Sequence, residues 1–475
     1  MRTWAIGDLD LHVRLSPTRP TRSLAQAIRE AVVDGRLRPG TRLPASRRLA
    51  QDLGIARNSV ADAYGLLVAE GWLEARAGAG TWVGERVGGG PAPSPAPPVP
   101  APSLDLRAGI PDASTFPRAE WAAAVGRALE AAPDTDLGYT DVQGTRALRE
   151  ALADYLGRAR GVRTDADRLV VGNGFGDLLG MLCRVLAARG ARRFAVEEYG
   201  HEAHRRIVAA AGLEVVAVPV DGEGIDVEAL ARLDVAGVLV TAAHQFPTGV
   251  PLSARRRVAL TRWAERTEAL VVEDDYDGEF RYDRRAIGAL QALAPDHVAY
   301  VGTASKALAP AVALGWAAVP AGAVAEVRAL RSDEGRRPAA VHELTLAQLL
   351  RDYGYDRNVR RLRQHYRRRR EALDAALRAG APGCALVGLS AGLQVVVALA
   401  DGADEDAVVA QARLRGVRVE GLAHYAAGAA VRGSAGARAP AVVVGYGAAS
   451  PSRFDAAIAA LVDAITAARP GSAGA

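Results

Sequence analysis

Apolar residues recur at helical spacing in three separate runs within the first seventy residues. We expect Ser23 to cap the first helix, which ends before the Pro- and Gly-containing stretch 38–44. A second, shorter helix should be capped by Ser46 and stop at Gly54, and a third should open at Arg57 and stop at Gly71. Their apolar stripes contain Leu24, Ala27, Ile28, Ala31 and Val32 in the first helix, Leu49, Ala50 and Leu53 in the second, and Val60, Ala63 and Leu67 in the third.

The segment WLEARAGAGTWV (72–83) has the pattern of two short strands around a glycine-rich tip. Three helices followed by a hairpin predict a winged helix-turn-helix, whose third helix enters the DNA major groove. Arg57, Asn58 and Ser59 would then meet base edges and phosphates. Arg47 would reach a phosphate, and Gly78 would let the wing approach the DNA backbone. Periodicity alone leaves one alternative open, a small helical domain that binds another protein.

The segment ERVGGGPAPSPAPPVPAPS (85–103) contains Pro, Ala, Gly and Ser without apolar periodicity. Such a composition cannot bury a core and is typical of a semi-extended, mobile linker. The sequence therefore predicts a DNA-binding domain over residues 1–84, a linker over 85–103 and a large C-terminal domain over 104–475.

In the C-terminal region, short apolar runs alternate with amphipathic helical stretches such as RRRVALTRWAERT. The expected strands are LVVG (169–172), RFAVEE (193–198), EVVAVPV (214–220), AGVLVT (236–241), ALVVED (269–274) and HVAYVG (297–302). This alternation predicts an α/β fold with a mostly parallel sheet covered on both faces. Ligands of such sheets bind beyond the carboxyl ends of the strands.

Composition narrows the protein class without changing this division. No apolar run in the 475 residues has the length of a membrane span, and the first residues lack the apolar core of a signal peptide. The two cysteines, Cys183 and Cys384, form neither a metal motif nor a disulfide framework, so we expect a cytoplasmic protein. Residues 1–86 hold 13 Arg against 9 Asp and Glu, and this excess supplies +4 of the net charge of +5. A basic N-terminal unit favours nucleic acid as its partner.

Lys306, in VGTASKALAP (301–310), is the only lysine in the chain. In so arginine-rich a sequence, an ion-pairing lysine could become arginine at little cost. A lysine that must lose its proton and attack a carbonyl group could not, because a guanidinium stays protonated. Chance survival is the alternative interpretation.

Other polar motifs follow the predicted strands. VGNGFGD (171–177) opens an apolar helix whose free N–H groups could hold a phosphate, although a tight turn would look the same. EDDYDGEFRY (273–282) crowds carboxylates at a strand end, which favours a nearby cation or protonated ring over a metal with spaced ligands. HQFPTG (244–249) brings His244 and other hydrogen-bonding side chains, and EEYGH (197–201) brings His201, which could stack on a planar ring or be merely structural.

Together these motifs are the parts needed to hold pyridoxal 5′-phosphate (PLP). The lysine amine condenses with the aldehyde to form a Schiff base, and an aspartate keeps the pyridine nitrogen protonated. The glycine-rich helix start would bind the phosphate.

Two family resemblances sharpen these predictions. GRLRPGTRLPASRRLAQDLGIARNSVADAYGLLVAEGWLEARAGAGTWV (35–83) resembles the GntR-type winged helix along its whole length, which implies that Arg47, Arg57, Asn58, Ser59 and Gly78 contact DNA. Residues 105–450 resemble fold-type-I aminotransferases, which implies a mostly parallel sheet and a small α+β subdomain. The matching stretches include LGYTDVQGTRALREALADYLGRARGV (137–162), TAAHQFPTGVPLSARR (241–256), VVEDDYDGEFRY (271–282) and YVGTASKALAP (300–310). The whole chain resembles a MocR-type regulator.

The second resemblance assigns site residues. Lys306 would form the Schiff base and Asp274 would face the pyridine nitrogen, while Tyr276 would bond the phenolic oxygen of the ring and His201 would stack on it. No other catalytic residue is assigned. The phosphate would meet Thr303, Ser305 and the backbone of Gly174, Phe175 and Gly176, and His244 would add a polar group. Tyr139 would reach into the site of the partner subunit, which implies a homodimer.

The chain departs from the family pattern at several positions. Ala313 stands where a phosphate-binding arginine is usual, a loss that would weaken cofactor binding by roughly 1.5–3 kcal/mol; Arg205 is a possible substitute. Phe175 replaces the usual Ser or Thr, and Ala304 the usual Phe. Val443 stands at about the place of the arginine that clamps the substrate carboxylate, so ordinary transamination is disfavoured.

The sequence thus predicts a cytoplasmic transcriptional regulator that binds double-stranded DNA at paired half-sites. Its aminotransferase-like domain would bind PLP, or a PLP adduct with an amine or amino acid, as a small-molecule effector. One alternative is an active aminotransferase fused to a DNA-binding domain. The other is a regulator whose effector domain has lost the cofactor.

Overall fold

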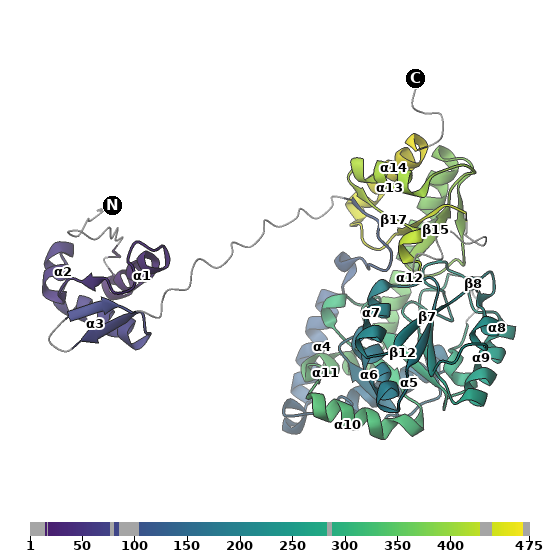
Figure 1. Cartoon of the computed structure of the whole chain (residues 1–475), viewed down its shortest axis with the longest axis horizontal. Coiled ribbons are helices and arrows are strands. Elements are labelled where there is room, and N and C mark those ends of the chain that lie inside the picture. Colours follow the sequence, from purple (N-terminus) through teal and green to yellow (C-terminus); the bar gives the residue numbers. More distant parts are fainter. Residues whose placement is uncertain are drawn as a thin grey trace. The chain divides into compact units, whose positions relative to one another are not determined.

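The computed structural model describes residues 15–16, 18–76, 80–84, 104–282, 287–427 and 439–468. The chain divides into two compact units, Met1–Ala101 and Pro102–Ala475, which are described separately below (Figure 1). Gly78 and the predicted linker lie outside the described residues. Within those ranges, no helix is both long and apolar enough to cross a membrane.

The N-terminal unit is a winged helix-turn-helix, as predicted. Its helices α1 and α2 both pack against α3, and a three-stranded antiparallel sheet in the order β1-β3-β2 closes the unit. The predicted apolar stripes are buried in one core, to which the sheet contributes Leu43, Leu73 and Val83. The elements are α1 (Pro20–Val33), β1 (Arg42–Leu43), α2 (Ser46–Leu53), α3 (Arg57–Ala69), β2 (Leu73–Arg76) and β3 (Gly80–Val83).

Both predicted serine caps are wrong. Ser23 lies inside α1, which begins at Pro20, because a proline at the first helical position is pre-organised and has no N–H to satisfy. The Ser23 hydroxyl donates to the Pro20 carbonyl at 3.1 Å instead. Ser46 is the first residue of α2, and the N-cap position is occupied by Ala45, which makes no side-chain capping hydrogen bond. Gly54 ends α2 with φ 64°, in the left-handed conformation that glycine adopts without strain, as predicted.

The C-terminal unit is built on a seven-stranded sheet in the order β5-β13-β12-β11-β10-β6-β7. Neighbouring strands are parallel except where β13 runs antiparallel to both β12 and β5, so the mostly parallel prediction is confirmed. β13 was not predicted, because its Gly-Trp-Ala-Ala sequence is poor in residues that favour strands. The strands are β5 (Leu169–Gly172), β6 (Arg193–Glu197), β7 (Glu214–Val218), β10 (Gly237–Val240), β11 (Leu270–Asp274), β12 (Val298–Thr303) and β13 (Gly315–Ala318).

Helices cover both faces of this sheet (Figure 1). Alternate residues of β5 face opposite ways: Val170 packs with α6, whereas Leu169 and Val171 join the core that contains α5 and α11. This alternation explains why the strands are apolar throughout. The covering helices include α4 (Arg118–Ala131), α5 (Arg146–Arg160), α6 (Phe175–Ala188), α7 (Glu202–Ala210), α9 (Ala254–Thr267), α10 (Val324–Glu334) and α11 (Ala340–Arg351).

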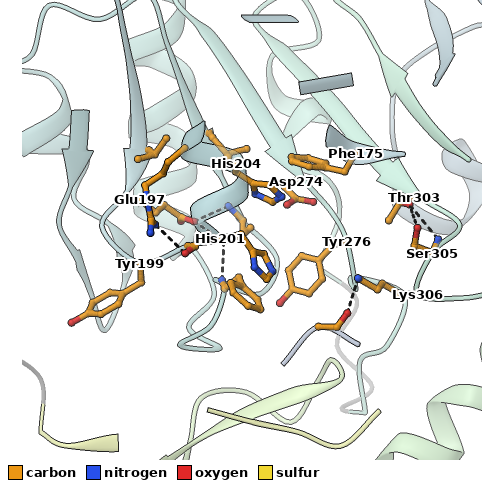
Figure 2. A pocket seen from close by; sticks show the side chains of 17 residues that line it. Phe175, Glu197, Tyr199, His201, His204, Asp274, Tyr276, Thr303, Ser305 and Lys306 are labelled. Atoms are coloured by element: carbon orange, nitrogen blue, oxygen red, sulfur yellow. Dashed lines mark hydrogen bonds between the residues drawn. The ribbon is translucent and has the colours of Figure 1, made fainter. Parts of the chain in front are cut away.

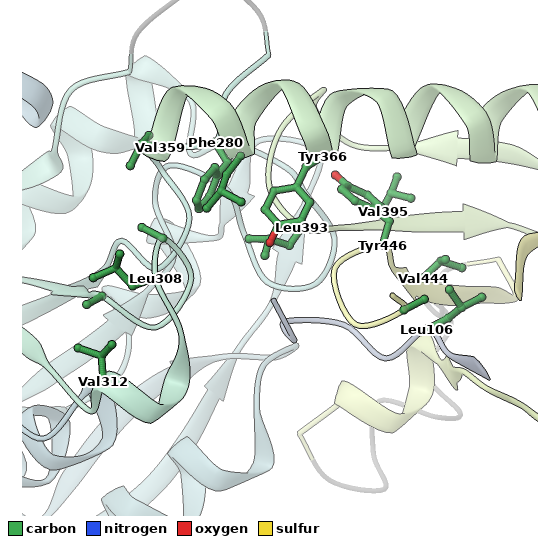
Figure 3. Close-up of a cluster of buried hydrophobic side chains, with 14 of the residues drawn as sticks. Leu106, Phe280, Leu308, Val312, Val359, Tyr366, Leu393, Val395, Val444 and Tyr446 are labelled. Carbon is green, nitrogen blue, oxygen red and sulfur yellow. The ribbon is translucent and has the colours of Figure 1, made fainter. Parts of the chain in front are cut away.

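A smaller α+β subdomain follows, as the resemblance implied. Its four-stranded sheet has the order β14-β15-β18-β17 and packs with the neighbouring helices. The long helix α12 runs from the large domain into the subdomain, and Figure 3 shows its Val359 and Tyr366 in one cluster with side chains of both parts. The elements are α12 (Gly354–Gly380), β14 (Ala385–Val387), β15 (Gln394–Ala398), α13 (Glu405–Leu414), β17 (Glu420–Gly421), β18 (Ala441–Gly445) and α14 (Pro451–Ala467).

The first strand of the C-terminal unit belongs to the subdomain. β4 (Leu104–Asp105) pairs in parallel with β16 (Val417–Arg418). The Leu106 amide donates to the Arg418 carbonyl at 2.9 Å, and the Gly445 amide donates to the Leu106 carbonyl at 2.8 Å. The start of the unit is therefore fixed to a strand more than three hundred residues later.

A buried ion pair stabilises the large domain behind the carboxyl end of β11. Arg160 donates to both carboxylate oxygens of Asp275 at 2.7 and 3.1 Å, and Tyr300 donates to the same carboxylate at 2.7 Å. We expect Asp275→Ala to lower the free energy of unfolding by about 3–5 kcal/mol, because it leaves the Arg160 charge buried and unpaired. Asp352→Ala, which removes the exposed pair with Arg127, should cost less than about 1 kcal/mol. Urea unfolding measures both, and equal losses would contradict this interpretation.

Candidate functional site

A pocket lies at the carboxyl ends of β6, β10, β11 and β12, where the sequence predicted ligand binding (Figure 2). Parallel strands end at the same edge of a sheet, so residues distant in sequence meet there. Lys306 follows β12, His201 precedes α7, and Asp274 and Tyr276 lie at the end of β11; all four converge on this pocket. The lining residues are Gly109, Phe175, Val196, Glu197, Tyr199, Gly200, His201, His204, Arg205, Leu239, Thr241, Phe246, Asp274, Tyr276, Thr303, Ser305 and Lys306.

Lys306 follows β12 and lies inside the pocket, not in a surface ion pair. Its Nζ donates to the Gly109 carbonyl at 2.7 Å. Burial lowers the pKa of the Lys306 ammonium, while the nearby carboxylates of Asp274 and Asp277 oppose that shift. A lysine whose amine loses its proton more easily is a better nucleophile.

Asp274, the last residue of β11, presents a carboxylate oxygen that has no hydrogen-bond partner among the described residues. Burial raises the pKa of this carboxyl well above its usual value; Asp275 adds to the rise, and Lys306 opposes it. An unpaired, buried carboxylate oxygen is costly unless a donor reaches it. A protonated ring nitrogen supplies such a donor, so the residues present fit the pyridine nitrogen of PLP.

The carboxylates around Asp274 each have a different partner. Glu273 accepts from the Leu290 and Gln291 amides at 2.7 and 3.0 Å, and Asp275 pairs with Arg160. These partners relieve the predicted repulsion between the neighbouring carboxylates of Glu273, Asp274 and Asp275. Asp274 is the one of the three that lines the pocket. Among the described residues, no group of three or more His, Cys, Asp or Glu side chains could hold a metal ion.

His201 precedes α7 and stacks on Phe246, with ring centroids 3.9 Å apart and planes 21° apart. Burial lowers the pKa of His201 to about 4, and Lys306 and Arg205 add to that effect. The imidazole is thus a neutral, flat group inside the pocket. His204, one turn later, also lines the pocket, and burial lowers its pKa to about 3. The sequence prediction found the first histidine and missed the second.

The predicted phosphate end lies where α6 begins. Gly174 precedes the helix with φ 96°, Phe175 lines the pocket, and Gly176 is in the first turn. Thr303 and Ser305 line the same pocket, and the Thr303 hydroxyl donates to Ser305 Oγ at 3.0 Å. Backbone N–H groups of a helix start and two hydroxyls are suitable donors to a phosphate.

Tyr276 lines the pocket, but His244 does not. The structure places His244 behind Tyr276, with its Nδ1 2.8 Å from Asp277 Oδ2 and 3.2 Å from the Tyr276 hydroxyl. A direct cofactor contact of His244 is therefore not supported, because this carboxylate holds its ring away from the pocket. Tyr139 is 98% exposed and lies outside the pocket, so its contact with a partner subunit stays a prediction.

The structure shows the surroundings of Val443, which departs from the family pattern, and of Arg205, the possible substitute for the missing phosphate arginine. Val443 is fully buried in β18 and packs with apolar residues, so it offers no charge to a carboxylate. Arg205 is the one arginine among the lining residues, and its guanidinium donates to the carbonyls of Gly200 and Tyr425 at 3.0 and 3.2 Å. It is held beside the pocket by backbone groups.

Ala313 follows the short helix Pro310–Val312 with φ 52°, in the left-handed region. The carbonyl oxygen of the next residue, Leu314, lies 3.2 Å from the Thr303 hydroxyl oxygen, so this turn borders the predicted phosphate end. We expect Ala313→Arg to tighten PLP binding about tenfold or more, because a charge-assisted contact is restored. Ala313→Gly is the control: it relieves about 1 kcal/mol of backbone strain and should leave PLP affinity unchanged. Titration with PLP and then with pyridoxal, which lacks the phosphate, checks both, since the gain should vanish with pyridoxal.

Glu197, which sequence reasoning did not single out, ends β6 and lines the pocket. Its carboxylate accepts from the Thr241 hydroxyl at 2.6 Å and from Gln245 Nε2 at 3.2 Å, and burial raises its pKa to about 7. The folded state therefore favours the protonated acid, and this contribution to stability, complete below pH 4.5, is lost as pH rises through 7. Glu197→Gln cannot ionise, so its stability relative to wild type should increase between pH 5 and pH 8, by up to roughly 3 kcal/mol. Urea unfolding at both pH values measures this, and an unchanged difference would contradict it.

The predicted DNA contacts in the N-terminal unit gather at the starts of two helices. Arg57 and Asn58 are exposed in the first turn of α3, Ser59 is half-buried beside them, and Arg47 is exposed in the first turn of α2. In the described ranges neither Arg47 nor Arg57 has an ion-pair partner, which leaves both available to phosphates. Sequence reasoning did not single out the wing residue Trp82, whose ring centre lies 5.7 Å from the Arg42 guanidinium and 5.2 Å from that of Arg76.

Comparisons with known proteins agree with both halves of the chain. Residues 102–434 match the family of class I and II aminotransferases, and residues 20–83 match the gntR family of bacterial regulatory proteins. Among solved structures, kynurenine aminotransferase from Pyrococcus horikoshii is similar with a TM-score of 0.68 and 23% identity, covering 77% of this chain and 91% of that one. At that identity the likeness shows the fold.

Two curated relatives span both units. The HTH-type pyridoxine biosynthesis transcriptional regulator PdxR of Corynebacterium glutamicum is 35% identical over 88% of this chain and 91% of its own. The probable rhizopine catabolism regulatory protein MocR of Rhizobium meliloti is 31% identical over 75% of this chain and 77% of its own. The chain therefore belongs to the MocR-type transcriptional regulators, in which a GntR-type DNA-binding domain is joined to an aminotransferase-like domain.

Proposed function

We propose that this regulator senses PLP, or its adduct with an amine or amino acid, through a Schiff base on Lys306. The observation that carries the proposal is the unpaired carboxylate oxygen of Asp274 in the same pocket as the only lysine of the chain. When bound, PLP supplies an aldehyde and an electron-withdrawing ring. The relative named as a regulator of pyridoxine biosynthesis supports a B6 vitamer as the effector.

The pocket residues that the sequence predicted each have a role in this proposal. Lys306 holds the cofactor covalently, and Asp274 accepts a hydrogen bond from the ring nitrogen. His201 stacks on the ring, and Tyr276 donates to its phenolic oxygen. The phosphate is bound by donors that lie together in the structure, namely the start of α6, Thr303 and Ser305.

We propose that the domain binds its effector without turning over amino acids. Val443 is apolar and buried where an arginine would clamp a substrate carboxylate, so a substrate would lose its bidentate positioning. An active aminotransferase remains the alternative, and turnover of an amino acid and keto acid pair by the purified protein would favour it.

The proposed output is DNA binding by a homodimer at paired half-sites. Two winged helices on one dimer would read two half-sites, so the arrangement of the C-terminal domains would set their reach. Effector binding changes that arrangement only as far as it favours one of two states.

A titration with PLP, followed by absorbance and run beside DNA binding to the protein's own upstream region, tests the proposal. We expect a visible absorbance band that saturates and a change in DNA affinity over the same concentration range. Pyridoxamine 5′-phosphate, which lacks the aldehyde, should give neither. A colourless protein at excess PLP would support loss of the cofactor, and DNA binding indifferent to PLP would contradict effector sensing.

A further inference from the structure

The hydroxyl of Tyr276 is contacted by side chains from two parts of the C-terminal unit. Gln394, the first residue of β15 in the subdomain, donates from Nε2 to the Tyr276 oxygen at 2.5 Å. Gln394 is 1% exposed, and its side-chain oxygen Oε1 has no hydrogen-bond partner among the described residues. The hydroxyl oxygen of Tyr276 thus already accepts one hydrogen bond from outside the pocket.

The buried pair behind Tyr276 determines where its hydroxyl hydrogen can point. His244 and Asp277 are 3% and 2% exposed, and a carboxylate at 2.8 Å from His244 Nδ1 requires a proton on that nitrogen. An Nδ1 that donates to Asp277 cannot also accept from Tyr276. Behind the ring the hydroxyl has two further acceptors: the His244 carbonyl, 3.4 Å away, and the Asp277 carboxylate, whose Oδ2 already accepts from His244 Nδ1. The better direction for the hydrogen is therefore the pocket, which Tyr276 lines.

Tight packing keeps this pair in place. A side chain at Gly392 would bring its Cβ to 2.6 Å from His244 Cε1, and the residue has φ 73°, so glycine is required there. The Leu389 amide donates to the Gly249 carbonyl at 2.9 Å, and the Gly392 amide donates to the Phe280 carbonyl at 2.8 Å. The subdomain loop 388–392 thus packs over His244 and Asp277, and it prevents the His244 ring and the Asp277 carboxylate from turning.

We propose that His244, Asp277 and Gln394 are positioning residues that direct the Tyr276 hydroxyl hydrogen into the pocket, where it bonds the phenolic oxygen of PLP. This inference rests on the proposed function and deepens it. Burial and the neighbouring Asp277 raise the pKa of Tyr276 well above its usual value, so the tyrosine remains a donor. A hydrogen bond donated to an anionic oxygen stabilises the anion, so the bound cofactor should lose its proton at lower pH than it would without this bond.

The test is a spectrophotometric pH titration of the PLP complex. Tyr276→Phe should raise the midpoint of the absorbance change by about one pH unit or more, the size expected for a charge-assisted bond. Gln394→Met and His244→Asn should raise it by part of that amount. Each should have no further effect in combination with Tyr276→Phe, because they act through its hydroxyl. Unchanged midpoints in the single variants, or additive shifts in the double variants, would overturn the proposal.

Gln143→Leu is the matched control. Gln143 is 2% exposed and donates to the Asp167 and Leu169 carbonyls, outside the pocket, so it should lower stability without moving the midpoint. Apart from Tyr276 itself in Tyr276→Phe, all these variants retain the ionisable groups that line the pocket, which are Asp274, Glu197, Tyr199, His201, His204, Arg205 and Lys306. A wild-type protein that takes up no PLP would overturn both proposals, whereas normal uptake with unmoved midpoints would overturn this one alone.

Discussion

Lys306→Ala should abolish the visible absorbance that PLP gives with the wild-type protein and weaken PLP binding by at least a hundredfold. The reason is chemical, because no other pocket side chain is an amine that can condense with an aldehyde. Lys306→Arg should be equally colourless, although it keeps the charge, since a guanidinium stays protonated. Absorbance and equilibrium dialysis measure the two effects.

The composition of the chain makes this experiment unusually selective. Lys306 is the only lysine, so borohydride reduction of the PLP complex can add cofactor mass only there and at the N-terminal amine. Peptide mass analysis of wild type and Lys306→Ala separates these two sites. Equal labelling of both proteins, or a normal absorbance band in Lys306→Arg, would contradict the assignment.

Arg57→Ala should weaken binding to the protein's own upstream DNA by about 5- to 150-fold, the range of a base or phosphate contact worth roughly 1–3 kcal/mol. Arg57 is exposed at the start of α3, where the first turn of a recognition helix meets the groove. Arg47→Ala should weaken binding to all sequences alike and reduce the salt slope by about 1, as loss of one phosphate contact does. Measurement of Kd at several salt concentrations distinguishes the two variants.

Arg29→Ala provides the control for this experiment. Arg29 lies on α1 and is paired with both carboxylate oxygens of Glu70 at 2.8 Å, so its charge is already neutralised. We expect its DNA affinity to stay within about twofold of wild type, as for a partly exposed surface pair. Equal losses in Arg29→Ala and Arg57→Ala would indicate unfolding of the N-terminal unit instead of a lost contact.

The sequence was most informative where local pattern determines structure. The third helix begins at Arg57 as predicted, and each of the six expected strands of the large domain is present, within one or two residues at its ends. The predictions failed where a distant contact or a neighbouring proline decides the outcome. The first helix begins at Pro20 and is not capped by Ser23. β13 forms from an alanine-rich segment because β5 and β12 provide hydrogen-bonding partners on both of its sides.

The site shows the same division. The lone lysine pointed to Lys306, and the family resemblance singled out Asp274 among the carboxylates that end β11; both line the pocket. No sequence pattern shows which neighbour neutralises which carboxylate: the partner of Asp275 is Arg160, on a helix 115 residues earlier, and the position of His244 depends on Asp277. Such pairings follow from tertiary packing. They decide whether a polar residue faces the ligand or supports one that does.

The pairing of β4 with β16 has a mechanical consequence. Residues 104 and 105 follow directly on the predicted linker, and they are bonded to a strand beside the subdomain helices, not to the seven-stranded sheet. A rotation of the subdomain would therefore carry residues 104 and 105 with it, and with them the end of the predicted linker. A tilt of the subdomain by a few degrees would displace the start of the C-terminal unit, and the DNA-binding unit is joined to it there.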